Sequence, residues 1–246
     1  MEFDLVFLFR LLSISGGLVA IFFLYNILIL TKGGSKAWKY MTSSGILIGV
    51  WGIFQVIFGY FIPITQIRLI SGFLVFPIIS IFNMIYPIVF LEDMGLKKFK
   101  WLTIRNAWYY FFILIVTLSL YNFSIPFNDI LAELTSISHT LLPFCFAFSV
   151  FGYYFLWKGT RLKMWLCLTL GTILLVIGTG FNLYSACCCN GNFFLICENY
   201  HYDYVNTLPL YCSESLISIA LKGPVFLIIG VLFYYAGFFF MWKSMR

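Results

Sequence analysis

Long apolar runs separated by short polar segments dominate this sequence. A helix needs about 20 predominantly apolar residues to cross the hydrocarbon core of a bilayer. Seven runs reach this length, and we expect helices near residues 5–31, 41–62, 67–91, 105–122, 128–157, 163–187 and 214–242. The connections between them are too short for a soluble domain. The pattern therefore predicts one all-α transmembrane domain over residues 1–246, a bundle of seven membrane-spanning helices.

Composition agrees with a chain whose surroundings are lipid. Hydrophobic residues make up 62% of the 246 residues and charged residues 10%, and the mean hydropathy is +0.98. A soluble domain is about 25% charged, so this chain lacks the polar surface to cover a water-soluble core. The acidic start, with Glu2 and Asp4, does not fit the basic region of a signal peptide, so we expect the first run to remain a membrane helix.

The charges are distributed unequally between the two sets of connections. One set carries twelve of the fifteen basic residues against two acids, Glu92 and Asp93; these basic residues are Lys32, Lys36, Lys39, Lys97, Lys98, Lys100, Arg105, Lys158, Arg161, Lys163, Lys243 and Arg246. An excess of Lys and Arg marks the cytoplasmic side. The pattern predicts a cell-membrane protein with its N-terminus outside and its C-terminus inside. It also explains the net charge of +6 without a nucleic-acid partner, for which no binding motif is present.

Small residues indicate which helix faces meet, because they let backbones approach closely in lipid. They form stripes in five of the expected helices. The stripes are Ser13, Gly17 and Ala20 in 5–31, Gly45, Gly49, Gly52 and Gly59 in 41–62, Ala132, Ser136, Pro143 and Ala147 in 128–157, Gly171, Gly178 and Ser185 in 163–187, and Gly223, Gly230 and Gly237 in 214–242. Helix 105–122 has no such stripe and is expected at the periphery. Four tryptophans near the cytoplasmic ends are typical of interfacial anchors, namely Trp38, Trp101, Trp157 and Trp242.

Polar side chains inside the membrane are costly and face the protein interior or a ligand. The candidate ligand-binding residues are Arg10, Gln55, Glu133, His139, Asn182, Glu214 and Lys222. Apart from the deeper His139 and the rim residue Glu214, they lie roughly 7–13 Å below the outer end of their helices, at about 1.5 Å per residue. We expect a polar pocket in the outer half that takes a small ligand from outside. In the alternative, these groups only satisfy each other, or Arg10 and Lys222 extend to the headgroups.

Two further features bear on the mechanics of the bundle. Of the polar residues singled out, only Asn83 belongs to the inner half, which we therefore expect to be nearly without polar groups. Prolines inside the expected helices free a carbonyl group four residues earlier and bend the helix; they are Pro77, Pro87, Pro143 and Pro224. They predict hinges or sites of broken helix.

Cysteines concentrate in the expected outer loop, residues 188–213, and at its border. Five of the seven are found there, namely Cys187, Cys188, Cys189, Cys197 and Cys212, whereas Cys145 and Cys167 fall inside helices. In an oxidising compartment this pattern predicts a disulfide-stapled cap over the polar pocket. A metal site with His201 lacks the usual ligand spacing, and lipidation of the triplet is expected on the opposite face.

No catalytic motif appears, so the sequence does not favour an enzyme. Retinal at Lys222 is disfavoured, because helix 67–91 offers no membrane carboxylate as counterion; no cofactor or metal is expected. The leading interpretation is a receptor-like or sensor-like bundle, with a cytoplasmic or membrane protein as partner for its basic face. The alternatives are a small-solute transporter, for which a polar path would have to continue through the inner half, and a structural or assembly subunit of a larger membrane complex.

Overall fold

The chain is helical throughout the part that the computed structural model describes. That part comprises residues 18, 21–23, 25–29, 36–43, 46–47, 50, 76–96, 101–123, 130–188 and 214–245, with no strand among them. Five helices have described bounds: α4 (Phe76–Asp93), α5 (Ile104–Phe123), α6 (Ile130–Thr160), α7 (Lys163–Cys188) and α10 (Glu214–Met245). The bounds of α5, α6, α7 and α10 lie within three residues of those expected from the apolar runs.

Local sequence explains where several of these helices begin and end. Gly95, with φ of +65°, terminates α4, and the amide of Leu96 donates to the carbonyl of Leu91 at 2.9 Å, as in a Schellman cap. The hydroxyl of Thr103 accepts from the amide of Asn106 at 3.1 Å and so caps the start of α5. α6 ends at Thr160, and the next residue, Arg161, takes a φ of +59°.

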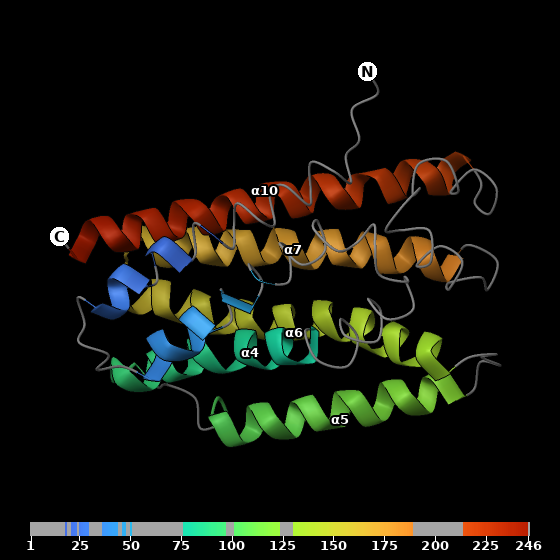
Figure 1. The fold of residues 1–246 in the computed structure, drawn as a ribbon, viewed down its shortest axis with the longest axis horizontal. Coiled ribbons are helices and arrows are strands. Elements are labelled where there is room, and N and C mark those ends of the chain that lie inside the picture. The colour runs from blue at the N-terminus through green and yellow to red at the C-terminus, as the bar shows by residue number, and fades with distance from the viewer. Residues whose placement is uncertain are drawn as a thin grey trace.

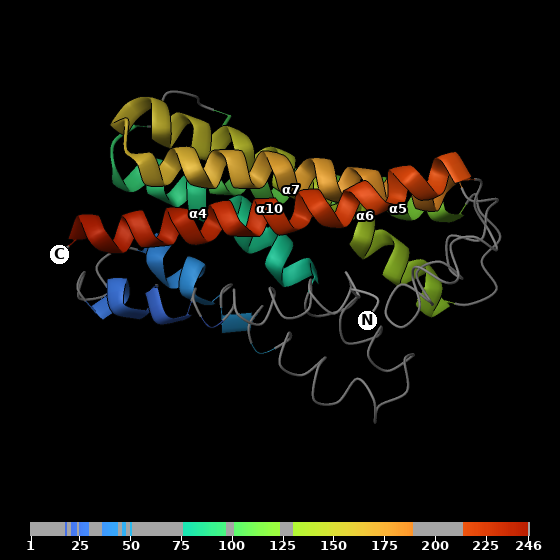
Figure 2. The ribbon, with the colours of Figure 1, turned by 90° about the horizontal axis from the view of Figure 1, so that it is seen from above.

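The helices pack as a row in which each one contacts its neighbours. Figure 1 shows α10, α7 and α6 side by side, with α4 and α5 on the far side of α6. Among the described helices, the main contacts of α5 are with α6 and α4, as expected for a peripheral helix. Figure 2 shows the N-terminal part of α6 turning away from α7, a change of direction that accords with Pro143 inside this helix.

The expected glycine stripes of α7 and α10 face each other. A β-carbon added at Gly171 would lie 2.9 Å from the carbonyl oxygen of Gly230, and one at Gly178 would lie 2.9 Å from that of Gly223. The two backbones therefore meet at a separation that only glycine permits. The prediction that these stripes mark contacting faces is confirmed for this pair, and the stripe of residues 45–59 falls almost wholly outside the described residues.

Three helices are long and apolar enough to cross a membrane within the described part: Leu141–Thr160, Lys163–Phe181 and Val225–Ser244. Many large apolar side chains are also exposed, as on the outer face of α5, where Ile113 is 63% and Leu120 66% exposed. Such a surface suits lipid and not water. The part of the chain that the structure describes is therefore all-helical and compatible with a membrane. A bundle of seven crossings is not shown, and the expected helices 5–31 and 41–62 lie largely outside the described residues.

The described residues between 18 and 50 lie at the end of the bundle that carries the C-terminus (Figure 2). Phe23 contacts Trp242 of α10, with ring centroids 5.6 Å apart. Trp38 packs edge-on against Phe90 of α4 at 4.6 Å and is only 5% exposed. The prediction of an interfacial anchor is therefore wrong for Trp38, because residues 36–43 are already helical and turn this ring into the core.

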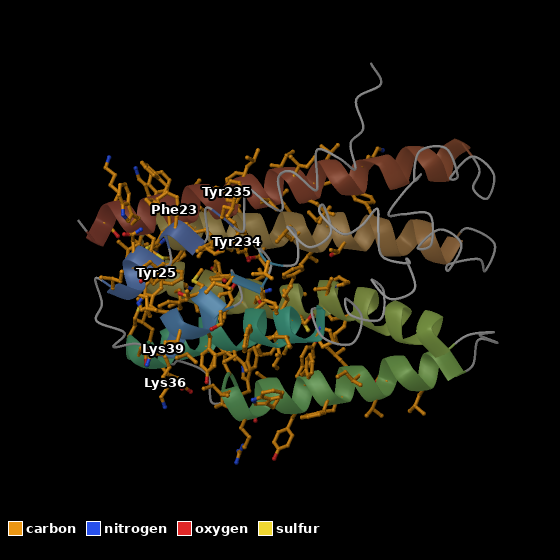
Figure 3. The ribbon with its side chains drawn as sticks, in the orientation of Figure 1. Phe23, Tyr25, Lys36, Lys39, Tyr234 and Tyr235 are labelled. Carbon is orange, nitrogen blue, oxygen red and sulfur yellow. The ribbon has the colours of Figure 1, made fainter. Side chains whose placement is uncertain are left out.

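Basic side chains gather at this same end. Figure 3 shows Lys36 and Lys39 near the end of the bundle where the C-terminus lies. Lys158, Arg161 and Lys163 surround the turn between α6 and α7 and are exposed, and Lys243 is in the last turn of α10. Several of the basic connections that the sequence places on one side of the membrane therefore lie together at one end of the fold.

Candidate functional site

The predicted outer pocket falls mostly on residues whose side chains the structure does not describe. Arg10, Gln55, Cys189, Cys197 and Cys212 lie outside the described residues. For Glu133, His139, Asn182, Cys187, Cys188 and Glu214, the structure describes only a backbone position on α6, α7 or α10.

Lys222 is the one member of that predicted set with a described side chain, and it is exposed. Its neighbour Gly223 is buried against Gly178 of α7. An exposed Lys222 accords with the alternative in which it extends to the headgroups. The outer pocket remains a prediction.

A different polar group lies inside the described core, between α4, α6, α7 and α10. We call it the polar core; it consists of Asn83, Tyr86, Ser149, Tyr153, Trp165, Thr172 and Tyr234. These residues come from four helices that are distant in sequence. Figure 3 shows Tyr234 on α10, in the half of this helix that ends at the C-terminus.

The polar core is anchored on α4 by Asn83. Its amide nitrogen donates to the carbonyl of Ile79 at 3.0 Å, and its amide oxygen accepts the hydroxyl proton of Tyr86 at 2.6 Å. Both residues are almost fully buried. Because buried polar groups are costly without partners, these bonds fix the side chains of one face of α4.

Pro87 leaves one carbonyl group of α4 without its helical hydrogen bond, and α6 supplies the missing donor. A proline has no amide proton, so the carbonyl of Asn83, four residues earlier, loses its helical donor. The hydroxyl of Ser149 on α6 donates to this carbonyl at 2.5 Å, and it shares its one proton with the carbonyl of Cys145 on its own helix at 2.9 Å. Gly152, one turn further along α6, admits the proline ring: a β-carbon there would lie 2.5 Å from Cβ of Pro87. The break in α4 is thus repaired by its neighbour.

A third link joins α7 to α10. The hydroxyl oxygens of Thr172 and Tyr234 lie 2.7 Å apart. Thr172 gives its single proton to the carbonyl of Leu168 at 2.6 Å, so Tyr234 must be the donor in the bond between the two helices. Gly171, the residue beside Thr172, meets the ring of Tyr234, and the hydroxyl pair therefore borders the glycine contact.

Tyr153 on α6 lies among these groups and joins them. Its ring centroid is 5.6 Å from that of Tyr86, 6.4 Å from that of Tyr234 and 6.2 Å from the stacked ring of Trp165. Tyr153 and Trp165 are both 0% exposed. Among the described residues, neither the Tyr153 hydroxyl nor the indole Nε1 of Trp165 has a hydrogen-bond partner.

The sequence predicted an inner half nearly without polar groups, and this expectation is wrong at the described end of the bundle. Tyrosine, threonine and serine were read as part of apolar runs, since each is compatible with a membrane helix. A local signal did exist: Tyr153 adjoins Gly152, Thr172 adjoins Gly171, and Tyr234 follows Gly230 by one helical turn. Hydroxyl groups beside glycines on a contacting face are well placed to bond across helices.

The chemistry of the polar core is that of neutral hydrogen bonding. No group of three or more His, Cys, Asp and Glu that could hold a metal ion occurs among the described residues. Cys145, which is buried, and Cys167 are free thiols, as expected for cysteines that act as small apolar residues. The arrangement offers hydroxyl, amide and indole groups that can exchange partners when helices shift.

Comparison of the chain with protein-family models, with curated proteins and with solved structures found no match.

Proposed function

We propose that this chain is a receptor-like or sensor-like bundle of seven helices in the cell membrane, with its N-terminus outside. The three apolar helices support the membrane assignment. The exposed basic side chains Lys36, Lys39, Lys158 and Lys243, together with Arg161, support a cytoplasmic location for the end that carries the C-terminus. A partner protein reads the state of the bundle at this basic end.

The observation that carries the sensor proposal is the incompletely bonded polar core. A buried donor that no protein group bonds either stays unbonded or bonds a small mobile partner such as water, and either arrangement can change when helices move. Here two fully buried donors, on Tyr153 and Trp165, have no partner among the described residues. They lie next to a proline break that one hydroxyl group repairs from the neighbouring helix. Such a network gives the bundle a second set of bonds to adopt when its helices move.

In this proposal the stimulus is a small ligand that binds in the outer half. The pocket is formed by Arg10, Gln55, Glu133, His139, Asn182, Glu214 and Lys222, and a disulfide-stapled loop covers it. Two cations and two carboxylates in one pocket would suit a small zwitterion. Helix α6 links pocket and polar core, because it carries both His139 and Tyr153 and has Pro143 between them.

Ligand titration of the protein in lipid nanodiscs tests this proposal. The probes are small amino acids and carboxylates, and the readout is the fluorescence of Trp165 in a variant that keeps only this tryptophan. We expect a saturable change that is lost in the variants Arg10→Ala and Lys222→Ala. Saturable binding without a change at Trp165 would contradict the coupling, and no binding by any probe would contradict the ligand class.

Topology is tested separately by thiol labelling of intact cells. Because the segment 187–212 holds five cysteines, one thiol is left free or paired between chains, and we expect an impermeant maleimide to label at most one cysteine before reduction and all five after it. Labelling of more than one cysteine before reduction would contradict the disulfides, and labelling only after permeabilisation would contradict the orientation.

A transporter is the second candidate, and the polar core favours it. An inner half without polar groups argued against a path for solutes, and the hydroxyl groups of Tyr86, Tyr153 and Tyr234 remove that argument. Uptake of a labelled probe into proteoliposomes distinguishes the two: a transporter accumulates the probe on the far side, whereas a sensor only binds it.

A further inference from the structure

The free donors and acceptors of the polar core follow from its hydrogen bonds. Tyr86 gives its proton to Asn83, and Tyr234 gives its proton to Thr172, since the threonine proton is already used. Both phenol oxygens keep a lone pair that can accept. Within the described helices, the proton of Tyr153 and the N–H of Trp165 are still without acceptors. The polar core therefore combines two free donors with two free acceptors.

These four groups belong to neighbouring rings. Tyr153 is the centre of the set, with ring centroids 5.6 Å from Tyr86, 6.4 Å from Tyr234 and 6.2 Å from Trp165. The Tyr153 hydroxyl also lies close to the hydroxyl groups of Tyr86 and Tyr234 and interacts with both, but neither contact has the geometry of a full hydrogen bond. The four side chains come from α4, α6, α7 and α10, and the rings of the other three all lie around Tyr153.

We infer that the polar core binds one water molecule. Water accepts two hydrogen bonds and donates two, which matches the free groups on Tyr153, Trp165, Tyr86 and Tyr234. Buried waters in proteins make about three such bonds, to polar groups that otherwise have no partner. In this arrangement the water connects all four helices, because each of the four side chains comes from a different one.

The site does not depend on the sensor proposal. A bound water would join the helices in a purely structural bundle as well as in a receptor, and its presence is measured without any ligand for the outer pocket. If the protein is a sensor, the water is the member of the network that can leave or change partners at the lowest cost.

The first test is the thermal stability of Tyr153→Phe in the full-length protein. If Tyr153 donates to a bound water, the variant loses that bond and Tm falls by roughly 2–4 °C. If the hydroxyl is simply unpaired, its removal leaves Tm unchanged or raises it, which would overturn the inference. Tyr109→Phe, on the exposed face of α5, is the matched control and should leave Tm unchanged.

The second test distinguishes a water from a direct bond between two tyrosines. A direct bond couples Tyr153→Phe to only one of Tyr86→Phe and Tyr234→Phe in double-mutant cycles. A shared water couples it to both, and to Trp165→Phe. Infrared spectra recorded in ordinary and heavy-oxygen water give an independent signal, because an ordered water contributes a shifted O–H band. We expect the band in the wild type and its loss in Tyr153→Phe. Coupling to one tyrosine alone, or no such band in the wild type, would overturn the inference even if a variant fails to fold.

Discussion

The contact between α7 and α10 and the outer face of α5 use opposite kinds of side chain. At the contact, Gly171 and Gly230 let two backbones meet. On α5, large side chains such as Phe112 and Ile113 point away from the bundle and are more than half exposed. Both regions are strongly apolar, so hydropathy alone does not distinguish them. The comparison teaches that side-chain size, not polarity, separates helix contacts from the lipid-facing surface in this chain.

The two regions differ in hydrogen bonding as well. The hydroxyl pair of Thr172 and Tyr234 lies beside the glycine contact, and Ser149 connects α6 to the carbonyl freed by Pro87. Close backbones bring such groups within bonding distance. The polar core is therefore a consequence of the same small residues that define the contact.

The largest effect on stability is expected from a β-carbon added at the contact between α7 and α10. Gly171→Ala should lower the free energy of unfolding by about 1–3 kcal/mol, because the new methyl group meets the backbone of Gly230. Gly180→Ala is the matched control on the same helix, since its added β-carbon has no atom within 4 Å. It should raise stability by about 0.5–1 kcal/mol. Denaturation in detergent measures both, and equal effects would contradict the close contact.

Removal of the hydroxyl that repairs α4 should have the next largest effect. Ser149→Ala leaves the carbonyl of Asn83 without a donor, and we expect a loss of about 1–3 kcal/mol. In a Pro87→Ala background the amide proton returns and satisfies that carbonyl. Ser149→Ala should then cost clearly less. A double-mutant cycle measures the coupling, and purely additive effects would show that Ser149 does not act through the proline break.

The hydroxyl pair between α7 and α10 should contribute less. Tyr234→Phe and Thr172→Val should show a coupling energy of about 0.6 kcal/mol and at most ~1.7 kcal/mol, as for other interhelical bonds in membranes. The measurement is a double-mutant cycle on unfolding in detergent. Zero coupling would place the two hydroxyl groups apart in the folded protein.

The smallest effect is expected on the outer face of α5. Ile113→Ala should change the stability of the protein in lipid nanodiscs by less than about 0.5 kcal/mol, because the atoms that are removed contact lipid and are not packed in the core. Thermal denaturation measures the change. A loss as large as that of Gly171→Ala would mean that this face packs against another helix or another protein.

Several parts of this fold could be predicted from the pattern of residues. Apolar run lengths placed α5, α6, α7 and α10 because a membrane helix must be long and continuous. The spacing of Gly223, Gly230 and Gly237 marked the face of α10 that meets α7, since small residues have a defined steric role. The absence of small residues from 105–122 marked α5 as peripheral. Each of these features can be recognised within a single helix, without knowing which other helices it contacts.

The polar core could not be predicted in the same way. Whether Tyr153 is a lipid-facing or a buried residue depends on which residues of α4 and α10 lie opposite, and that is a property of the three-dimensional packing. Trp38 shows the same limit: its position near basic residues suggested an interface, but helix 36–43 directs it against Phe90. The outer pocket rests on one or two polar residues in each of five expected helices and stays a prediction.

The central claim is that glycine-lined faces are inside a membrane bundle and that the outer face of α5 contacts lipid. Spin labels placed singly at positions 109 to 120 of α5 and 168 to 175 of α7, in nanodiscs, test it through their accessibility to dissolved oxygen. The account predicts high accessibility at Tyr109, Ile113, Val116 and Leu120, which are exposed, and low accessibility at Leu168 and Thr172, which are buried. Equal oxygen accessibility on both helices, or stronger relaxation at Ile113 by a water-soluble nickel reagent than by oxygen, would contradict it.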